Sequence, residues 1–161
     1  MPTSGETQQA LSRLLSDELQ SARELQRTLD QEFDALSQGE ADRITEITAQ
    51  KQLQTLRLGQ HLQARDRFLA EHKLPAGQQG TDAIVKRLPA DAAAANLWQE
   101  LQSVGRRLRE RNEVNGGIIA HGQRHVRQAL AILSGQSGTG DTYGPEGTSC
   151  PGQLSQALAK A

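Results

Sequence analysis

The chain has 161 residues, of which 35% are hydrophobic, and its only aromatic residues are Phe33, Phe68, Trp98 and Tyr143. A core with so few aromatic side chains favours helix-on-helix packing over a β-sheet fold. The net charge of −1 and the lack of any run near the ~20 apolar residues that cross a bilayer argue against nucleic-acid binding and direct membrane insertion.

The single cysteine, Cys150, cannot form an internal disulfide. The sequence also opens without the apolar run and basic flank of a secretory signal. We therefore expect a cytoplasmic protein.

The first predicted helix spans residues 4–37 and stops at Gly39. Alternating steps of four and three place one narrow seam on this helix, which is typical of a helix that faces a partner helix. The seam consists of Leu11, Leu15, Glu18, Ala22, Leu25, Leu29, Glu32 and Leu36. We expect Glu18 and Glu32 to be buried or half-buried and to pair with Lys51, Arg65 or an arginine of the third helix. Contact with a partner protein is the alternative role for these two acids.

The second predicted helix spans residues 42–73, and the short connection before it makes the first two helices antiparallel neighbours in a hairpin. Its apolar positions form a broader stripe, as expected for a helix that touches two neighbours. The stripe consists of Ile44, Ile47, Leu53, Leu56, Leu58, Leu62, Phe68 and Leu69. Residues 75–90, rich in glycine and proline, are predicted to form a linker with a short helical turn over residues 83–88.

The third predicted helix spans residues 91–134, and its seam is interrupted by Asn112 and Asn115, which precede Gly116 and Gly117. Each glycine inside a helix costs about 1 kcal/mol relative to alanine. One interpretation is close approach of a neighbouring helix, or a kink. The other is a groove in which a client helix packs over the glycines while the asparagine amides bind it. The partner-binding residues expected on this helix are Asn112, Asn115, Gly116, Ile118, Ile119 and Val126.

Residues 135–161 are rich in Gly, Ser, Thr and Pro, with Leu154 and Leu158 on one face of a short helical segment. Burial of two leucines contributes at most about 3 to 6 kcal/mol, whereas ordering eight backbones costs roughly 8 to 16 kcal/mol. We therefore predict two parts, a helical bundle over residues 1–134 and a flexible client-binding tail over residues 135–161 that becomes helical on contact.

The sequence contains no motif that supports catalysis or cofactor binding. His121 and His125 have the one i, i+4 spacing that suits a metal, but a solvent-exposed pair explains them equally well, and we expect no metal site. There is neither a Gly-x-Ser-x-Gly elbow nor a P-loop. Glu18 and Glu32 lie roughly 21 Å apart along a straight helix, too far to act on one substrate atom. We expect a binding protein and not an enzyme.

The order of these features resembles the FlgN family of flagellar export chaperones. The resemblance rests on the long first helix with its spaced acids, on Lys51, on the Asn112-x-x-Asn115-Gly116 run with Ile118 and Ile119, and on a tail that bears Tyr143. It implies a cytoplasmic, non-enzymatic protein that holds hook-associated proteins by their helical termini before type III export. It also implies Tyr143 as a partner-binding residue and leaves open contact with the export apparatus and self-association.

The expected fold is thus all-α: an elongated antiparallel three-helix bundle, or coiled-coil hairpin, with a long third helix and a flexible C-terminal tail. A structural coiled-coil adaptor or oligomer would explain the seams equally well. A four-helix metal enzyme is the third class, and the lack of Glu-x-x-His pairs on facing helices argues against it.

Overall fold

The computed structural model describes residues 4–89 and 92–133. These residues form four helices, α1 (Ser4–Gln38), α2 (Ala41–Glu71), α3 (Gly77–Val85) and α4 (Ala93–Leu133), and no strand occurs among them, which confirms the all-α prediction. By its internal contacts the chain divides into two units, residues 1–119 and 120–161. The description below concerns the first unit unless the second is named.

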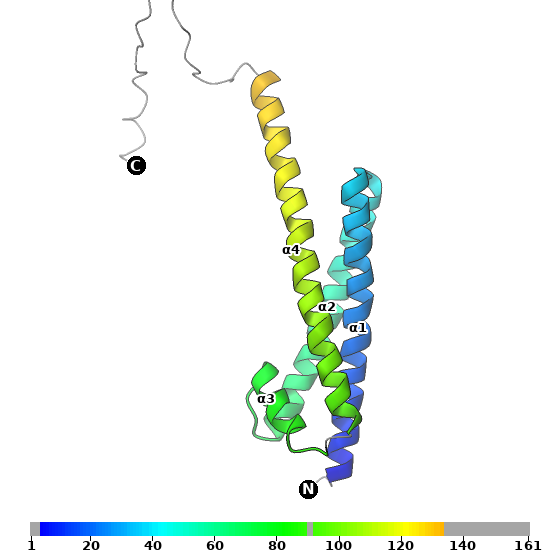
Figure 1. The fold of residues 1–161 in the computed structure, drawn as a ribbon, viewed down its shortest axis with the longest axis vertical. Helices are drawn as coiled ribbons and strands as arrows, with labels where there is room; N and C mark the ends of the chain where they lie inside the picture. The colour runs from blue at the N-terminus through cyan, green and yellow to red at the C-terminus, as the bar shows by residue number, and fades with distance from the viewer. Residues whose placement is uncertain (1–3, 90–91, 134–161) are drawn as a thin grey trace, which may run out of the picture. The chain divides into compact units, whose positions relative to one another are not determined.

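Helices α1 and α2 lie side by side and run in opposite directions (Figure 1). The chain reverses at Gly39, whose φ of 69° lies in the left-handed region that favours glycine, and the amide of Glu40 donates to the carbonyl of Ala35 at 3.0 Å. Gly39 is therefore the helix stop that the sequence predicted.

The seam of α1 is buried over almost its whole length, as the four-three spacing predicts. The buried apolar residues of α1 are Leu11, Leu15, Leu19, Ala22, Leu25, Leu29 and Ala35. The first four of them meet Phe68 and Leu69 of α2 and Trp98, Leu101 and Val104 of α4 in the core.

The broad apolar stripe of α2 is covered on only one side over its middle turns. Leu53 and Leu56 are each 67% exposed, and Leu62 is 38% exposed. Besides α1, the close backbone neighbour of α2 is α3. The expectation that α2 touches two neighbours is therefore confirmed, but these neighbours leave Leu53 and Leu56 largely exposed.

The predicted linker contains a true helix, α3, which lies earlier than the short turn predicted over residues 83–88. A Cβ on Gly80 would sit 1.8 Å from the carbonyl oxygen of Pro75, so only glycine fits there. The carboxylate of Asp66 accepts a hydrogen bond from the amide of Gly77 at 2.8 Å, and Asp82 accepts one from the indole of Trp98 at 2.7 Å. Tertiary contacts thus hold α3 in place despite its glycines.

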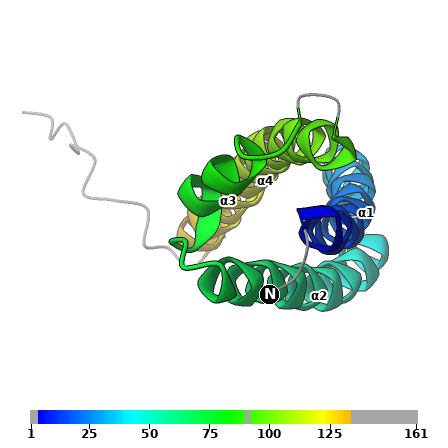
Figure 2. The same cartoon turned by 90° about the horizontal axis from the view of Figure 1, so that it is seen from below.

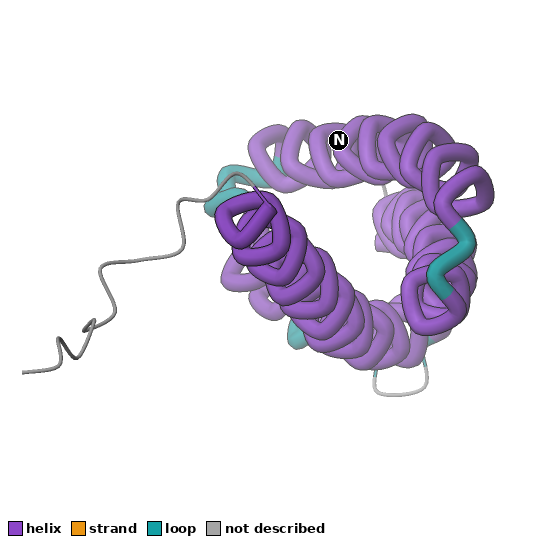
Figure 3. Tube along the Cα trace, turned by 90° about the horizontal axis from the view of Figure 1, so that it is seen from above, coloured by secondary structure: helices purple, strands orange, loops and turns teal. Residues whose placement is uncertain are grey.

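The first part of α4 is joined to α1 by side chains. No Cα atom of α4 lies within 8 Å of a Cα atom of α1 or α2. Ion pairs join Glu100 to Arg23 and Arg111 to Asp30. Seen from below, α1 lies between α2 and the first part of α4, with α3 on the other side (Figure 2). Figure 3 shows that helices make up nearly all of the described residues.

The glycines of α4 do not mark a close approach within the chain. A Cβ on Gly105, Gly116, Gly117 or Gly122 would meet nothing within 4 Å beyond its own helix. The interpretation of close helix packing is therefore wrong for Gly116 and Gly117, and α4 continues through both without a break. None of the described helices combines the length and the apolar character that a membrane span requires.

Candidate partner-binding groove

Glu18 and Arg65 form a buried ion pair between α1 and α2. The guanidinium Nη1 of Arg65 donates to Oε1 of Glu18 at 2.9 Å, and both side chains are more than nine-tenths buried. Burial raises the pKa of Glu18 to about 7; the charge of Arg65 lowers it and that of Asp66 raises it further. The guanidinium carbon of Arg65 also lies 5.0 Å from the ring centroid of Trp98, so the pair links all three long helices.

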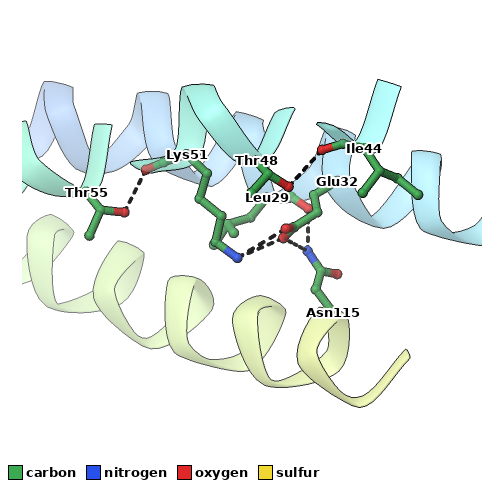
Figure 4. A network of polar contacts seen from close by, with 7 residues as sticks. All are labelled: Leu29, Glu32, Ile44, Thr48, Lys51, Thr55 and Asn115. Carbon is green, nitrogen blue, oxygen red and sulfur yellow. Dashed lines mark hydrogen bonds and ion pairs between the residues drawn. The ribbon is translucent and has the colours of Figure 1, made fainter. Parts of the chain in front are cut away.

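Glu32 is the centre of a second network (Figure 4). The ammonium of Lys51 donates to both carboxylate oxygens, at 3.0 and 3.2 Å. The amide nitrogen of Asn115 donates to Oε2 of Glu32 at 2.7 Å and to the carbonyl of Leu29 at 2.9 Å. The predicted pairing of the two seam acids with Arg65 and Lys51 is confirmed, and Asn115 adds the link from α4 to α1.

A groove runs between α2 and α4 with α1 as its floor. It consists of three cavities with volumes of about 440, 430 and 610 Å³. The first and second share Leu58, Gly105, Leu108 and Arg109, and the second and third share Lys51 and Thr55, so the three are continuous. We call this surface the α2–α4 groove. Its lining residues are Glu18, Ala22, Leu25, Leu29 and Glu32 of α1, Thr48, Lys51, Gln52, Thr55, Leu56, Leu58, Leu62 and Arg65 of α2, Gln78 of α3, and Trp98, Leu101, Gln102, Gly105, Arg106, Leu108, Arg109, Asn112 and Ile119 of α4.

The groove has an apolar middle and basic edges. Leu58 and Leu108 are half-buried on opposite walls, and Leu56, Leu62 and Ile119 are exposed. On α2 the groove spans residues 48–65, which is about 26 Å of helix. Its dimensions and chemistry suit an amphipathic helix laid along it.

Comparison with known protein families decides the class of the molecule. The sequence matches the family described as FlgN protein over residues 1–150. The chain belongs to the FlgN family. This is a family of chaperones of flagellum biogenesis, so membership supports a role as a flagellar export chaperone. No curated protein and no solved structure matches the chain.

The predicted partner-binding residues of this FlgN-family chain fall into five groups. Asn112 and Ile119 line the groove, whereas Asn115 is buried and bonded to α1. Gly116 is exposed and Ile118 half-buried. Val126 belongs to the second unit and is 60% exposed. The predicted residues of the tail, Tyr143, Leu154 and Leu158, lie outside the described residues. The binding role of all nine stays a prediction.

Sequence reasoning missed the residues that connect the cavities. Leu58, Gly105, Leu108 and Arg109 each line two of them. The sequence did contain a sign of this surface, because the apolar stripe of α2 is too broad for one neighbouring helix. That pattern does not indicate which apolar residues of the stripe stay exposed.

The histidine pair of α4 lies in the second unit of this FlgN-family chain. The Nε2 atoms of His121 and His125 are 2.9 Å apart on an exposed face. Among residues 4–89 and 92–133 there is no group of three or more side chains arranged to hold a metal ion.

Asn115 provides a direct test of the second network. We expect Asn115→Ala to lower the free energy of unfolding by about 1 to 3 kcal/mol, because the variant removes the donor that α4 supplies to the carbonyl of Leu29 and to the carboxylate of Glu32. Asn112→Ala is the matched control, since Asn112 is exposed and should change stability by no more than about 0.5 kcal/mol. Urea denaturation measures both. Equal stabilities would show that Asn115 does not join α4 to α1.

Proposed function

We propose that this chain is a cytoplasmic, non-enzymatic flagellar export chaperone that holds a helical terminus of a hook-associated protein in the α2–α4 groove. The observation that carries the proposal is the open second side of the α2 stripe, opposite the half-buried Leu108 of α4. Family membership supports the chaperone class, and the groove supplies a surface for a client.

An incoming helix would cover apolar side chains that the chain leaves exposed. Full burial of a leucine or isoleucine side chain contributes about 1.5 to 3 kcal/mol, and Leu56, Leu62 and Ile119 are each at least 38% exposed. Ordering the client helix offsets a large part of that gain. The result is binding that shelters an apolar helix yet releases it for export.

The groove is maintained by polar contacts beneath it. The pairs Glu18–Arg65 and Glu32–Lys51 fix α2 against α1, and Asn115 fixes α4 against the same helix. These contacts hold both walls of the groove against α1. The finer description of residues 1–134 as an antiparallel three-helix bundle with a coiled-coil hairpin is part of this proposal.

The tail over residues 135–161 is proposed as a second client-binding element, through Tyr143, Leu154 and Leu158. Val126 would extend the apolar contact from α4. Transfer of the client to the export apparatus is the step that such a chaperone serves.

The experiment that tests this function measures the affinity of a purified hook-associated protein for the full chain and for residues 1–134 by calorimetry. We expect saturable binding to the full chain and weaker binding after the tail is removed. No binding to the full chain would contradict the proposed function. Equal affinities would contradict only the part assigned to the tail.

A further inference from the structure

The exposed large apolar side chains of the described residues lie in two segments that contain no acid. They are Leu53, Leu56, Leu62, Val114, Ile119, Val126, Leu130, Ile132 and Leu133. Residues 47–65 contain Lys51, Arg57 and Arg65 but no Asp or Glu, and residues 114–133 contain Arg124 and Arg127 but no Asp or Glu. The surface left for a partner is therefore apolar. The three basic side chains of residues 47–65 each pair with a glutamate of α1, and Arg124 and Arg127 belong to the second unit, so any free positive charge beside the groove must lie elsewhere on α4.

Within the α2–α4 groove, positive charge remains in excess after the internal ion pairs are formed. Glu18 and Glu32 on the floor are each neutralised by a basic residue of α2. Arg106 and Arg109 on the α4 wall are exposed and form no ion pair or hydrogen bond with any other described side chain. Glu110 and Glu113 follow them by one helical turn but do not pair with them in the structure. The groove thus holds two positively charged side chains that form no ion pair in the described part of the chain, beside its apolar middle.

We propose that the groove selects an amphipathic helix whose apolar stripe is bordered by Asp or Glu side chains, with Arg106 and Arg109 as the residues that recognise those carboxylates. This inference rests on the proposed function and names the chemistry of the client segment. A guanidinium pairs with a carboxylate through two parallel hydrogen bonds, which fixes orientation as well as charge. Charges at the edge of an apolar contact act on specificity and on the rate of association.

The positive charges of Arg106 and Arg109 argue against a segment of this chain, or of a second copy of it, as the occupant of the groove. In a second copy, the exposed apolar segments 47–65 and 114–133 contain no acids, so docking would bring positive charges together. Residues 148–161 of the tail contain Leu154 and Leu158 with Lys160 and no Asp or Glu. Neither the exposed apolar segments nor the leucine-bearing end of the tail offers carboxylates to Arg106 and Arg109, and we therefore assign the occupant to another protein.

The test uses the full chain and three synthetic helical peptides of about 18 residues, roughly 27 Å long. All three carry leucines at alternating steps of three and four, and the bordering positions hold Glu, Gln or Lys. Fluorescence anisotropy gives the affinities at low and high salt. We expect the Glu peptide to bind about tenfold more tightly than the Gln peptide, with the Lys peptide weakest, and we expect the preference to shrink at high salt.

Two double variants with equal changes of charge test whether the preference for the Glu peptide arises in the groove. The double variant Arg106→Gln and Arg109→Gln should bind the Glu and Gln peptides within about twofold of each other. Its control pairs Arg13→Gln with Arg67→Gln, which removes two exposed arginines that do not line the groove and should leave the tenfold preference intact.

Equal binding of the Glu and Gln peptides to the unmodified chain would overturn the inference, as would no binding of any peptide. An unchanged preference in the Arg106 and Arg109 double variant would also overturn it. If a hook-associated protein still binds the full chain in any of these cases, the proposed function stands and only the charge selection fails.

Discussion

Replacement of Arg65 by methionine is expected to lower the free energy of unfolding by about 3 to 5 kcal/mol at pH 8, the largest stability change that the structure predicts. Arg65 is the ion-pair partner of Glu18 at 2.9 Å, and both side chains are buried. Without the guanidinium, Glu18 must either remain charged in an apolar site or take up a proton at pH 8. The contact with the ring of Trp98 is lost as well.

The pH dependence of the stability lost in Arg65→Met shows whether the charge of Glu18 causes that loss. Burial raises the pKa of Glu18 to about 7, above its ordinary value of 4.5, so between these pH values the folded state binds a proton that the unfolded state releases. Stability from this group is therefore fully present below about pH 4.5 and falls as the pH rises through 7. In Arg65→Met the pKa rises further, so the difference from the unmodified chain should shrink from pH 8 to pH 5.

A double variant is the control for lost packing. Glu18→Leu combined with Arg65→Met replaces the pair by apolar side chains of similar size, which is often neutral or stabilising for buried ion pairs. We expect its unfolding free energy to lie within about 1 kcal/mol of the unmodified chain, with little dependence on pH between 5 and 8 from this site. Urea denaturation at the two pH values measures all three proteins. A single variant as stable as the parent would contradict the assigned role of the pair.

The sequence predicts the polar contacts of the fold well because a narrow seam tolerates few interruptions. Glu18 and Glu32 occupy seam positions, so they must be buried, and buried carboxylates need basic partners. The second helix offers Lys51 and Arg65 to them, and the structure forms both pairs. Local rules also suffice for the turn at Gly39, where the left-handed conformation depends on one residue.

The glycines show where prediction from sequence fails. Glycine at 116 and 117 suggested close packing, but the close approach in this chain occurs at Gly80, against the carbonyl of Pro75. Helix α3 depends on that contact and on the hydrogen bond from Trp98 to Asp82, which join segments that no local pattern connects. Tertiary contacts outweigh helix propensity there.

The sequence predicts that the candidate site binds a helix, but it does not predict where on the molecule that site lies. The broad stripe of α2 indicated a second neighbour, and the sequence could not show that Leu53 and Leu56 stay exposed although α2 has two neighbours, α1 and α3. Asn115 illustrates the same limit, since an asparagine in a helical seam fits a client contact as well as the internal contact to Glu32 that the structure forms.

The largest expected change in binding comes from filling the groove at Gly105. This residue lines two of the three cavities, and a Cβ added to it would meet nothing within 4 Å beyond its own helix. Gly105→Leu should therefore keep the fold and stabilise α4 by roughly 0.5 to 1 kcal/mol. A client helix in the groove would meet the new side chain, and overpacking of that kind costs about 1 to 3 kcal/mol, or roughly 10- to 100-fold in affinity.

Gly59→Leu is the matched control. Gly59 lies inside α2, a Cβ on it would also meet nothing within 4 Å, and it does not line the three cavities. Both variants gain helix propensity, so only the position of the new side chain differs.

The affinity of these two variants for a purified hook-associated protein, measured by calorimetry beside their unfolding free energies, tests the central claim most directly. The α2–α4 groove as client site predicts that Gly105→Leu is at least as stable as the unmodified chain yet binds about 10- to 100-fold more weakly, while Gly59→Leu binds normally. A folded Gly105→Leu chain with the same affinity as Gly59→Leu would show that the client lies elsewhere.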